Sequence, residues 1–206
     1  MEMTKWFDTN YHFIVPEFHK NQEFKLFSRK IINEFLDAKQ VGINAKPVII
    51  GLLTYILLGK EKEEGFNKLE LAQKILPVYI QILKELETYG AEYIQFDEPF
   101  LALDLDEKSK ETYSLIYTEI RKQFPHLRII VATYFEGLRD DLSLAVSLPV
   151  NVLHLDLVRS PEQLEEVLKV IPETLHLSLG VIDGRNIWKN DFEKSLRLIR
   201  QATDKI

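Results

Sequence analysis

The chain has 206 residues, of which 46% are hydrophobic and 28% are charged, and its formal net charge is -6. This length suffices for one sizeable domain with a buried core. The acidic balance argues against a nucleic-acid or membrane-surface partner, because both favour an excess of Lys and Arg. The absence of cysteine excludes disulfides, thiolate zinc sites and cysteine nucleophiles. With no apolar signal-peptide core in residues 1–20 and no membrane-length apolar run, we expect a cytoplasmic protein.

A short β-rich run followed by an amphipathic stretch recurs along the chain. Asn67 and Gly90 are expected to cap the second helix, and Pro77 inside it predicts a kink or a break. Strict alternation of strands and helices predicts parallel strands with right-handed crossovers. The expected strands are 4–12, 46–51, 91–97, 127–133, 151–157 and 174–181, and the expected helices are 21–38, 67–89, 106–124, 138–147, 161–171 and 190–204.

Two architectures fit this alternation, an open doubly wound sheet and a TIM (β/α)8-type barrel. The six units are too few for a complete barrel, which needs about 250 residues. The strands of an open doubly wound sheet are apolar on both faces, whereas 151–157 and 174–181 place leucines on one face and His, Asp or Ser on the other. This pattern favours an α/β fold of the barrel type, incomplete by about two units, with a polar interior.

Polar residues follow the ends of these strands, where parallel α/β folds bind ligands. Asp97 and Glu98 end the third strand, and Pro99 fixes the turn after them. We therefore expect a polar mouth at this end, although a helix cap or a salt bridge would also explain the two acids. Its candidate substrate-binding residues are Lys5, Asn10, His12, Asp97, Glu98, Asp183, Arg185 and Asn186.

Other motifs allow a structural explanation as well as a functional one. His154, His176 and Asp156 have the residue types of metal ligands, but an internal hydrogen-bonded network is the favoured interpretation and we predict no metal site. The Asp-Gly pair at 183–184 also suits a plain turn, and Lys5 also suits a lysine lying along a packed strand. Neither a glycine-rich phosphate loop nor a Ser-His-Asp elbow occurs, and we predict no catalytic residue.

Several segments together resemble one family, the cobalamin-independent methionine synthases (5-methyltetrahydropteroyltriglutamate–homocysteine methyltransferases). The resemblance covers nearly the whole chain and implies that residues 1–206 are one domain, most of the N-terminal barrel of a two-barrel enzyme, with two β/α units preceding Met1. The segments are "MTKWFDTNYHFIVPEF" (3–18), "KPVIIGLLTYILLGK" (46–60), "ILPVYIQILKELETYGAEYIQFDEPFLALDL" (75–105), "ATYFEGLRDDLSLAVSLPVNVLHLDLVRSPEQL" (132–164) and "LSLGVIDGRNIW" (177–188).

The resemblance implies a reaction and partners for the full protein. The enzyme would move a methyl group from 5-methyltetrahydrofolate polyglutamate to homocysteine, whose thiol a zinc ion activates. The zinc ligands of the family are cysteines, a histidine and a glutamate of the C-terminal barrel, so this chain cannot carry that site. Lys5 corresponds to a lysine that contacts the folate tail, whereas a substrate role for Asp97 does not transfer safely from the other barrel.

We accordingly expect a fragment that supports folate binding and the catalytic barrel and is inactive alone. Its expected partners are the C-terminal barrel and the missing N-terminal units of the same polypeptide. The alternatives are a stand-alone barrel that binds a pterin or another anionic ligand without catalysis, and an independent enzyme on an open α/β sheet. An incomplete barrel also leaves two unpaired sheet edges, which are expected to pair with a neighbouring chain or with the rest of the enzyme.

Overall fold

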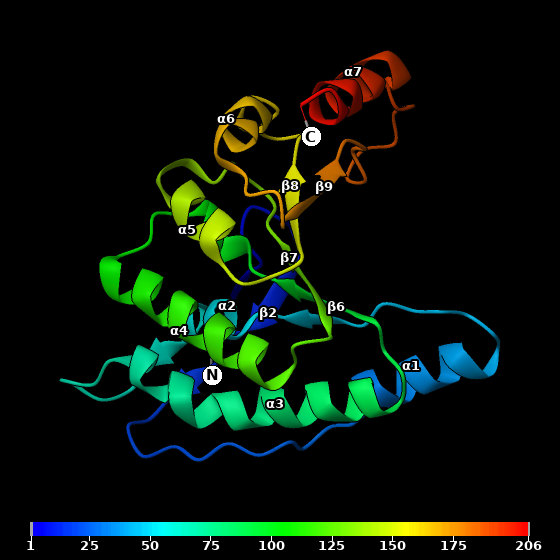
Figure 1. Ribbon diagram of the computed structural model, residues 1–206. Helices are drawn as coiled ribbons and strands as arrows, with labels where there is room; N and C mark the ends of the chain where they lie inside the picture. Colours follow the sequence, from blue (N-terminus) through cyan, green and yellow to red (C-terminus); the bar gives the residue numbers. More distant parts are fainter. Residues whose placement is uncertain (1, 206) are drawn as a thin grey trace.

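The computed structural model describes residues 2–205, whose main body is a five-stranded parallel sheet (Figure 1). Its strands are hydrogen-bonded in chain order: β4 (Val48–Ile50), β6 (Tyr93–Asp97), β7 (Arg128–Ala132), β8 (Val152–Asp156) and β9 (His176–Gly180). The helices are α1 (Lys30–Gln40), α2 (Leu52–Leu58), α3 (Ala72–Thr88), α4 (Glu107–Gln123), α5 (Leu142–Ser147), α6 (Gln163–Val170) and α7 (Phe192–Thr203).

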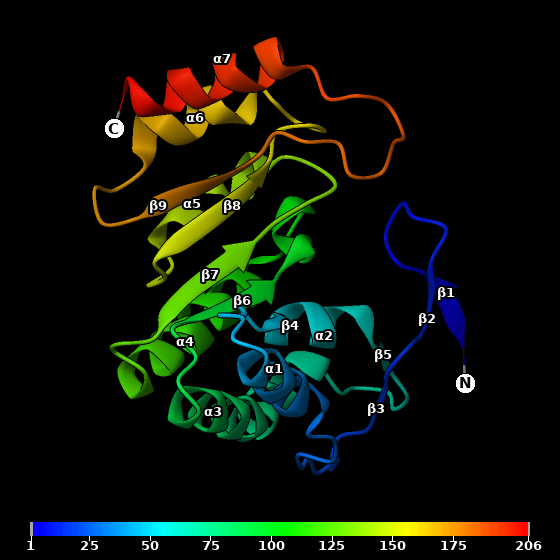
Figure 2. The same cartoon turned by 90° about the vertical axis from the view of Figure 1, so that its right-hand side faces the viewer.

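The two faces of the sheet differ as the period-two pattern predicts. Phe96 is fully buried, and its ring lies 6.2 Å from that of Tyr79 in α3 and 5.9 Å from that of Tyr117 in α4. The leucines of β8 are buried on the same face, whereas the alternate polar residues are only half-buried. Figure 2 shows the helices α3 to α7 on one side of the sheet and the other side open. The predicted outward orientation of the apolar rows is therefore confirmed.

The parallel α/β sheet is confirmed, but the sheet is not a closed barrel. Within residues 2–205, β4 and β9 are each paired on one side only. The sheet also contains five strands rather than the six expected.

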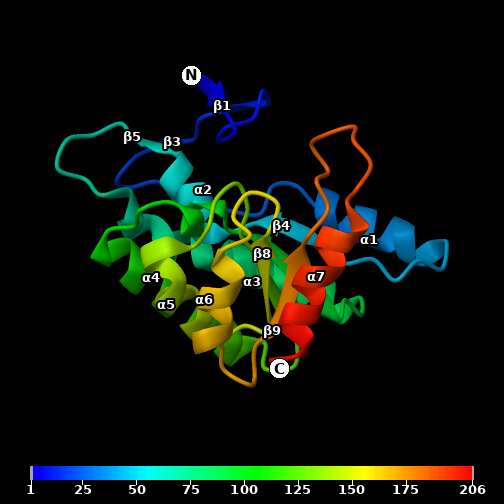
Figure 3. The same ribbon diagram turned by 90° about the horizontal axis from the view of Figure 1, so that it is seen from above.

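The predicted strand 4–12 is wrong. The segment forms an antiparallel hairpin of β1 (Met3–Lys5) and β2 (His12–Ile14), which stands apart from the main sheet (Figure 3). Thr9 makes the turn, since its hydroxyl donates to the Trp6 carbonyl at 2.7 Å and accepts from the Tyr11 amide at 3.1 Å. A further two-stranded sheet joins β3 (Glu17–Phe18) to β5 (Lys60–Glu61), in parallel.

One helix prediction is corrected, and one helix was not predicted. The helix expected at 21–38 begins only at Lys30, because Phe24 and Leu26 pack against the core from a non-helical segment. The helix α2 lies inside an apolar run that carries no amphipathic pattern, because it is buried around much of its circumference.

Pro77 does not break its helix, which runs continuously from Ala72 to Thr88. The proline stands near the start of α3, where it removes a single backbone hydrogen bond, and buried neighbours hold the helix in place. Gly90 ends α3 as predicted, with a φ of 89°. Asn67 does cap, but it caps the 3-10 turn Lys68–Leu71 that leads into α3, where its Oδ1 accepts from the Leu69 amide at 2.9 Å. None of the helices within the described residues is long and apolar enough to span a membrane.

Candidate functional site

The open face of the sheet carries a row of polar side chains that points away from the helices. Because the parallel strands are in register, Ala132 aligns with both Asp97 and His154, and His154 aligns with Ser178. Asp97, His154 and Ser178 are half-buried, and Asp97 is the last residue of β6, at the carboxyl end of the sheet where the sequence predicts the mouth.

Asp97 is at this mouth, held by two neutral donors. Its Oδ1 accepts from Gln95 Nε2 at 2.7 Å, and its Oδ2 accepts from the Tyr134 hydroxyl at 3.2 Å. Burial, and then the charge of Asp97, raise the pKa of Tyr134, so this phenol remains a proton donor at neutral pH. The Phe7 ring of the hairpin lies 5.5 Å from that of Phe135, the residue after Tyr134, so the hairpin packs next to the mouth.

Glu98 is not at the mouth, because successive residues of a strand point to opposite faces. Its side chain is 0% exposed and lies on the helical side of the sheet. Four donors surround the carboxylate: the Thr54 amide at 2.9 Å, the Thr54 hydroxyl at 2.7 Å, and the hydroxyls of Tyr113 at 3.0 Å and Tyr117 at 2.9 Å. Burial raises the pKa of Glu98, and these hydrogen bonds oppose that rise. Glu98 is therefore a core residue that joins β6 to α2 and α4.

A cavity of about 440 Å³ opens at the carboxyl ends of β8 and β9. It brings together three predicted residues, Asp183, Arg185 and Asn186. Asp183 accepts from the Arg185 amide at 3.0 Å and from Asn186 Nδ2, and the bond from Asn186 is the main cause that lowers the pKa of Asp183. The cavity is lined by Tyr134, His154, Asp156, Val158, Arg159, Gly180, Ile182, Asp183, Gly184, Arg185 and Asn186.

His154 and Asp156 have separate tasks in the wall of this cavity. The His154 Nδ1 atom lies 2.8 Å from the Ser178 hydroxyl, and burial lowers the pKa of the imidazole, which keeps it neutral at pH 7. Asp156 accepts from the amides of Phe135, Val158 and Arg159 at 3.0–3.1 Å and so fixes the loops after β7 and β8. His176 is exposed at the opposite end of β9. No group of three or more potential metal ligands occurs among residues 2–205.

The remaining predicted residues are on the hairpin and form a second group. Lys5 aligns with His12 across the two strands, and both are exposed, as is Asn10 in the connecting loop. One hairpin residue that sequence reasoning missed, Asp8, connects this group to the cavity through ion pairs with Arg159 and Arg185. Arg159 closely follows the predicted strand 151–157, so its place near the mouth can be predicted from the sequence. No local pattern marks Asp8 as its partner.

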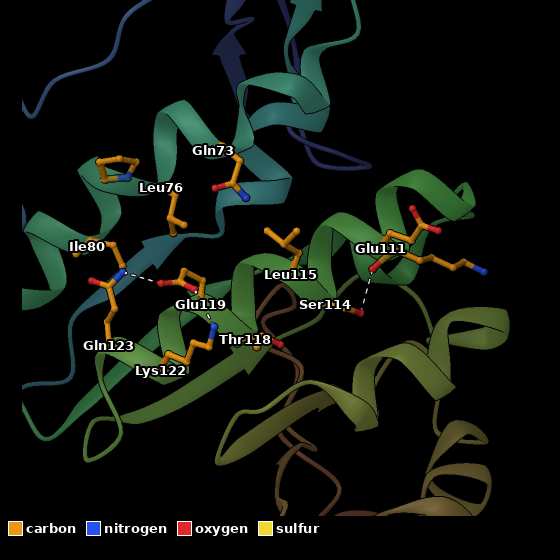
Figure 4. A pocket seen from close by; sticks show the side chains of 12 residues that line it. Gln73, Leu76, Ile80, Glu111, Ser114, Leu115, Thr118, Glu119, Lys122 and Gln123 are labelled. Atoms are coloured by element: carbon orange, nitrogen blue, oxygen red, sulfur yellow. Dashed lines mark hydrogen bonds and ion pairs between the residues drawn. The ribbon is translucent and has the colours of Figure 1, made fainter.

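A larger groove of about 1120 Å³ lies elsewhere, between α3 and α4 (Figure 4). Its apolar walls include Leu76, Ile80 and Leu115. It is formed by the helical layer, on the far side of the sheet from Asp97 and His154, so it is not part of the polar mouth.

Comparisons with known proteins agree on one family. Residues 1–206 match the family model described as "Cobalamin-independent synthase, N-terminal domain". Two relatives named 5-methyltetrahydropteroyltriglutamate–homocysteine methyltransferase are 57% identical over 206 residues, in Flavobacterium johnsoniae, and 54% identical over 205 residues, in Cytophaga hutchinsonii. These matches cover 99% and 98% of the chain but only 27% and 26% of the relatives, so the chain spans about a quarter of their length.

The fold likeness extends to a solved structure. A B12-independent methionine synthase from Shewanella sp. W3-18-1, in complex with selenomethionine, aligns with a TM-score of 0.63 at 18% identity, covering 89% of this chain and 57% of that one. At this identity the likeness shows the fold alone, whereas the family model and the relatives show descent. The chain therefore belongs to the cobalamin-independent methionine synthase family and matches its N-terminal domain.

Proposed function

We propose that the chain is part of an enzyme that transfers a methyl group from 5-methyltetrahydropteroyl-polyglutamate to homocysteine. The match of residues 1–206 to the family's N-terminal domain carries this proposal. The supporting relatives are named for this reaction and are far longer than the chain. The proposal is tested by expressing the protein with the additional length of its relatives and assaying methionine formation. Failure of that longer, folded protein to make methionine would contradict it.

The domain assignment follows from the same proposal, with residues 1–206 forming most of the N-terminal (β/α)8-type barrel. Two features support it: the strands are hydrogen-bonded in chain order, and the helices of Figure 2 cover one face. A doubly wound sheet would reverse its strand order and carry helices on both faces. In the longer protein we expect β4 or β9 to gain a further strand, and solution measurements on the 206-residue chain should show association through these edges. A monodisperse, highly stable monomer would contradict this expectation.

The chain's own residues do not fit a zinc site that activates a thiol. The sequence has no cysteine, and the described residues hold no cluster of three His, Cys, Asp or Glu side chains. The proposal therefore assigns homocysteine activation and zinc to the C-terminal barrel, with this domain supporting that barrel and the folate. Turnover by the 206-residue chain, or tight stoichiometric zinc, would overturn this division. The cytoplasmic location remains a prediction.

Lys5 is proposed as a contact for the polyglutamate tail. It is exposed on β1 and makes no ion pair with any residue in the described part of the chain, so its ammonium group is available to an anionic ligand. Titration of polyglutamylated methyltetrahydrofolate should show affinity for Lys5→Ala reduced by about 3- to 10-fold, the range of one solvent-exposed polar contact. Lys25→Ala, an exposed lysine outside the hairpin, is the matched control. Equal affinities for wild type and Lys5→Ala would remove Lys5 from the site. The other candidate substrate-binding residues remain predictions: Asn10, His12, Asp97, Asp183, Arg185 and Asn186.

A further inference from the structure

Two guanidinium groups converge on the single carboxylate of Asp8. Arg159 Nη2 lies 2.5 Å from Asp8 Oδ2, and Arg185 Nη1 lies 3.2 Å from each Asp8 oxygen. Asp8 is 151 and 177 residues away from these arginines in the chain. A carboxylate supplied by the hairpin loop thus occupies a position between two arginines of the β8 and β9 loops.

Asp8 lies on the β1–β2 hairpin, an element that can separate from the main sheet. An isolated two-stranded hairpin is at best marginally stable alone, and β1 and β2 pair only with each other within the described residues. Beside Asp8, Phe7 anchors the loop with its ring 5.5 Å from both Phe100 and Phe135, and Phe7 has a φ of 49°, which is unfavourable for a residue with a side chain. A few side chains therefore hold the hairpin against the sheet.

The other carboxylates near the cavity are already engaged by different donors. Asp156 accepts from three backbone amides, Asp97 accepts from Gln95 and Tyr134, and Asp183 accepts from an amide and from Asn186. Among the described residues, Asp8 is the one carboxylate in an ion pair with Arg159 or Arg185.

Directly beside these arginines is the cavity of about 440 Å³, which both of them line. In the wall of this cavity, the missing side chain of Gly180 leaves space next to His154. A Cβ on Gly180 would lie only 3.0 Å from His154 Nε2. The Nε2 atom makes no hydrogen bond to a residue that the structure describes, since the imidazole bonds Ser178 through Nδ1. The cavity thus joins two cations to a half-buried polar group that lacks a partner.

We propose that Arg159 and Arg185 form a binding site for a small carboxylate-bearing molecule, and that Asp8 occupies this site when no ligand is bound. Planar guanidinium groups match carboxylates in geometry as well as in charge. The three charged side chains are 40–47% exposed, and exposed ion pairs contribute little, so a ligand carboxylate can replace Asp8. Replacement releases the Asp8 anchor of the hairpin. The site shares Arg185 with the predicted substrate contacts, but it requires no step of the proposed methyl transfer.

The test measures ligand binding and hairpin release separately. Trp188 is 78% exposed, so Trp188→Phe leaves Trp6, which contacts Phe7 and Phe13, as the sole tryptophan of the chain. In this background, succinate is expected to shift Trp6 emission to longer wavelength as the hairpin opens. Succinamide, which has the same carbon skeleton without charge, is expected to give no shift at equal ionic strength. A shift with both compounds, or with neither, overturns the coupling of the hairpin to the site.

Calorimetric titration with succinate then locates the site. Asp8→Asn removes the internal competitor and is expected to tighten succinate binding by about 5- to 10-fold, near 1–1.4 kcal/mol, while Arg185→Gln weakens it by at least about 10-fold. Arg139→Gln is the matched control, because Arg139 pairs with Glu136 on the surface. Equal binding by wild type and Arg185→Gln overturns the site, and unchanged affinity in a folded Asp8→Asn protein overturns the role of Asp8.

Discussion

Asp97 and Glu98 are neighbours in the sequence with the same chemistry, yet they occupy opposite sides of the sheet. Asp97 is half-buried at the open mouth and accepts two hydrogen bonds from neutral donors. Glu98 is 0% exposed behind the sheet and accepts four. One step along a strand therefore separates a candidate ligand contact from a residue that the core requires.

The largest expected effect of a substitution is at Glu98. Glu98→Ala leaves the Thr54 amide and three hydroxyls without their shared acceptor in a fully buried place, and should lower the free energy of unfolding by about 3–5 kcal/mol. Urea denaturation followed by circular dichroism measures this change. A loss below about 1 kcal/mol, typical of a surface substitution, would contradict the core role.

A smaller loss is expected at Gly51, which makes room for Glu98. A Cβ on Gly51 would lie 1.9 Å from Glu98 Cδ, so Gly51→Ala must displace the buried carboxylate, at a cost of about 1–3 kcal/mol. Gly184→Ala at the mouth is the matched control, because no atom lies within 4 Å of its Cβ position. The control should change stability by less than about 0.5 kcal/mol. Equal losses in the two variants would argue against tight packing around Glu98.

The raised pKa of Glu98 predicts a pH dependence with a definite sign. The folded chain retains the Glu98 proton above the ordinary carboxyl pKa of about 4.3, so wild-type stability should fall as the pH rises from there to the folded pKa. Each pH unit between the unfolded and folded pKa values should cost about 1.4 kcal/mol of stability, and Glu98→Gln should lack this loss. Denaturation of both proteins between about pH 4 and 8 isolates the Glu98 contribution as their difference. A wild-type advantage that grows with pH would refute the predicted sign.

The smallest effect is expected at Asp97. Asp97→Asn keeps the shape of the side chain and an oxygen that accepts one hydrogen bond, so stability should change by less than about 1 kcal/mol. Thermal unfolding of Asp97→Asn and of Glu98→Gln, measured side by side, tests whether the two acids differ in their contribution to stability as their burial implies. Equal destabilisation by the two amide substitutions would erase the distinction between mouth and core.

Much of the fold was predictable from local patterns. The strands at 91–97 and 151–157, and the orientation of their leucines and histidine, follow from alternation with period two. The same rule, applied to Glu98, indicates that it faces away from Asp97. The cap at Asn67 also follows from a residue type with a local task.

Other features were decided by partners far away in the chain. The apolar helix α2 has no amphipathic signal, because other elements bury most of it. The stretch 4–12 has the composition of a strand, but the Thr9 turn folds it back and Asp8 reaches Arg159 and Arg185 across more than 150 positions. The candidate site was accordingly predicted in part: Asp183, Arg185 and Asn186 do gather at one cavity, whereas Lys5, Asn10 and His12 are on a separate hairpin.

The sequence by itself determined the alternation of strands and helices, the two faces of the sheet and the family to which the chain belongs, because each is encoded in residue order over short distances. Only the tertiary structure decided that the sheet stays open, that Glu98 belongs to the core and that Asp8 lies between two arginines. Those outcomes depend on burial and on pairing between distant segments, which the packing of the whole chain fixes.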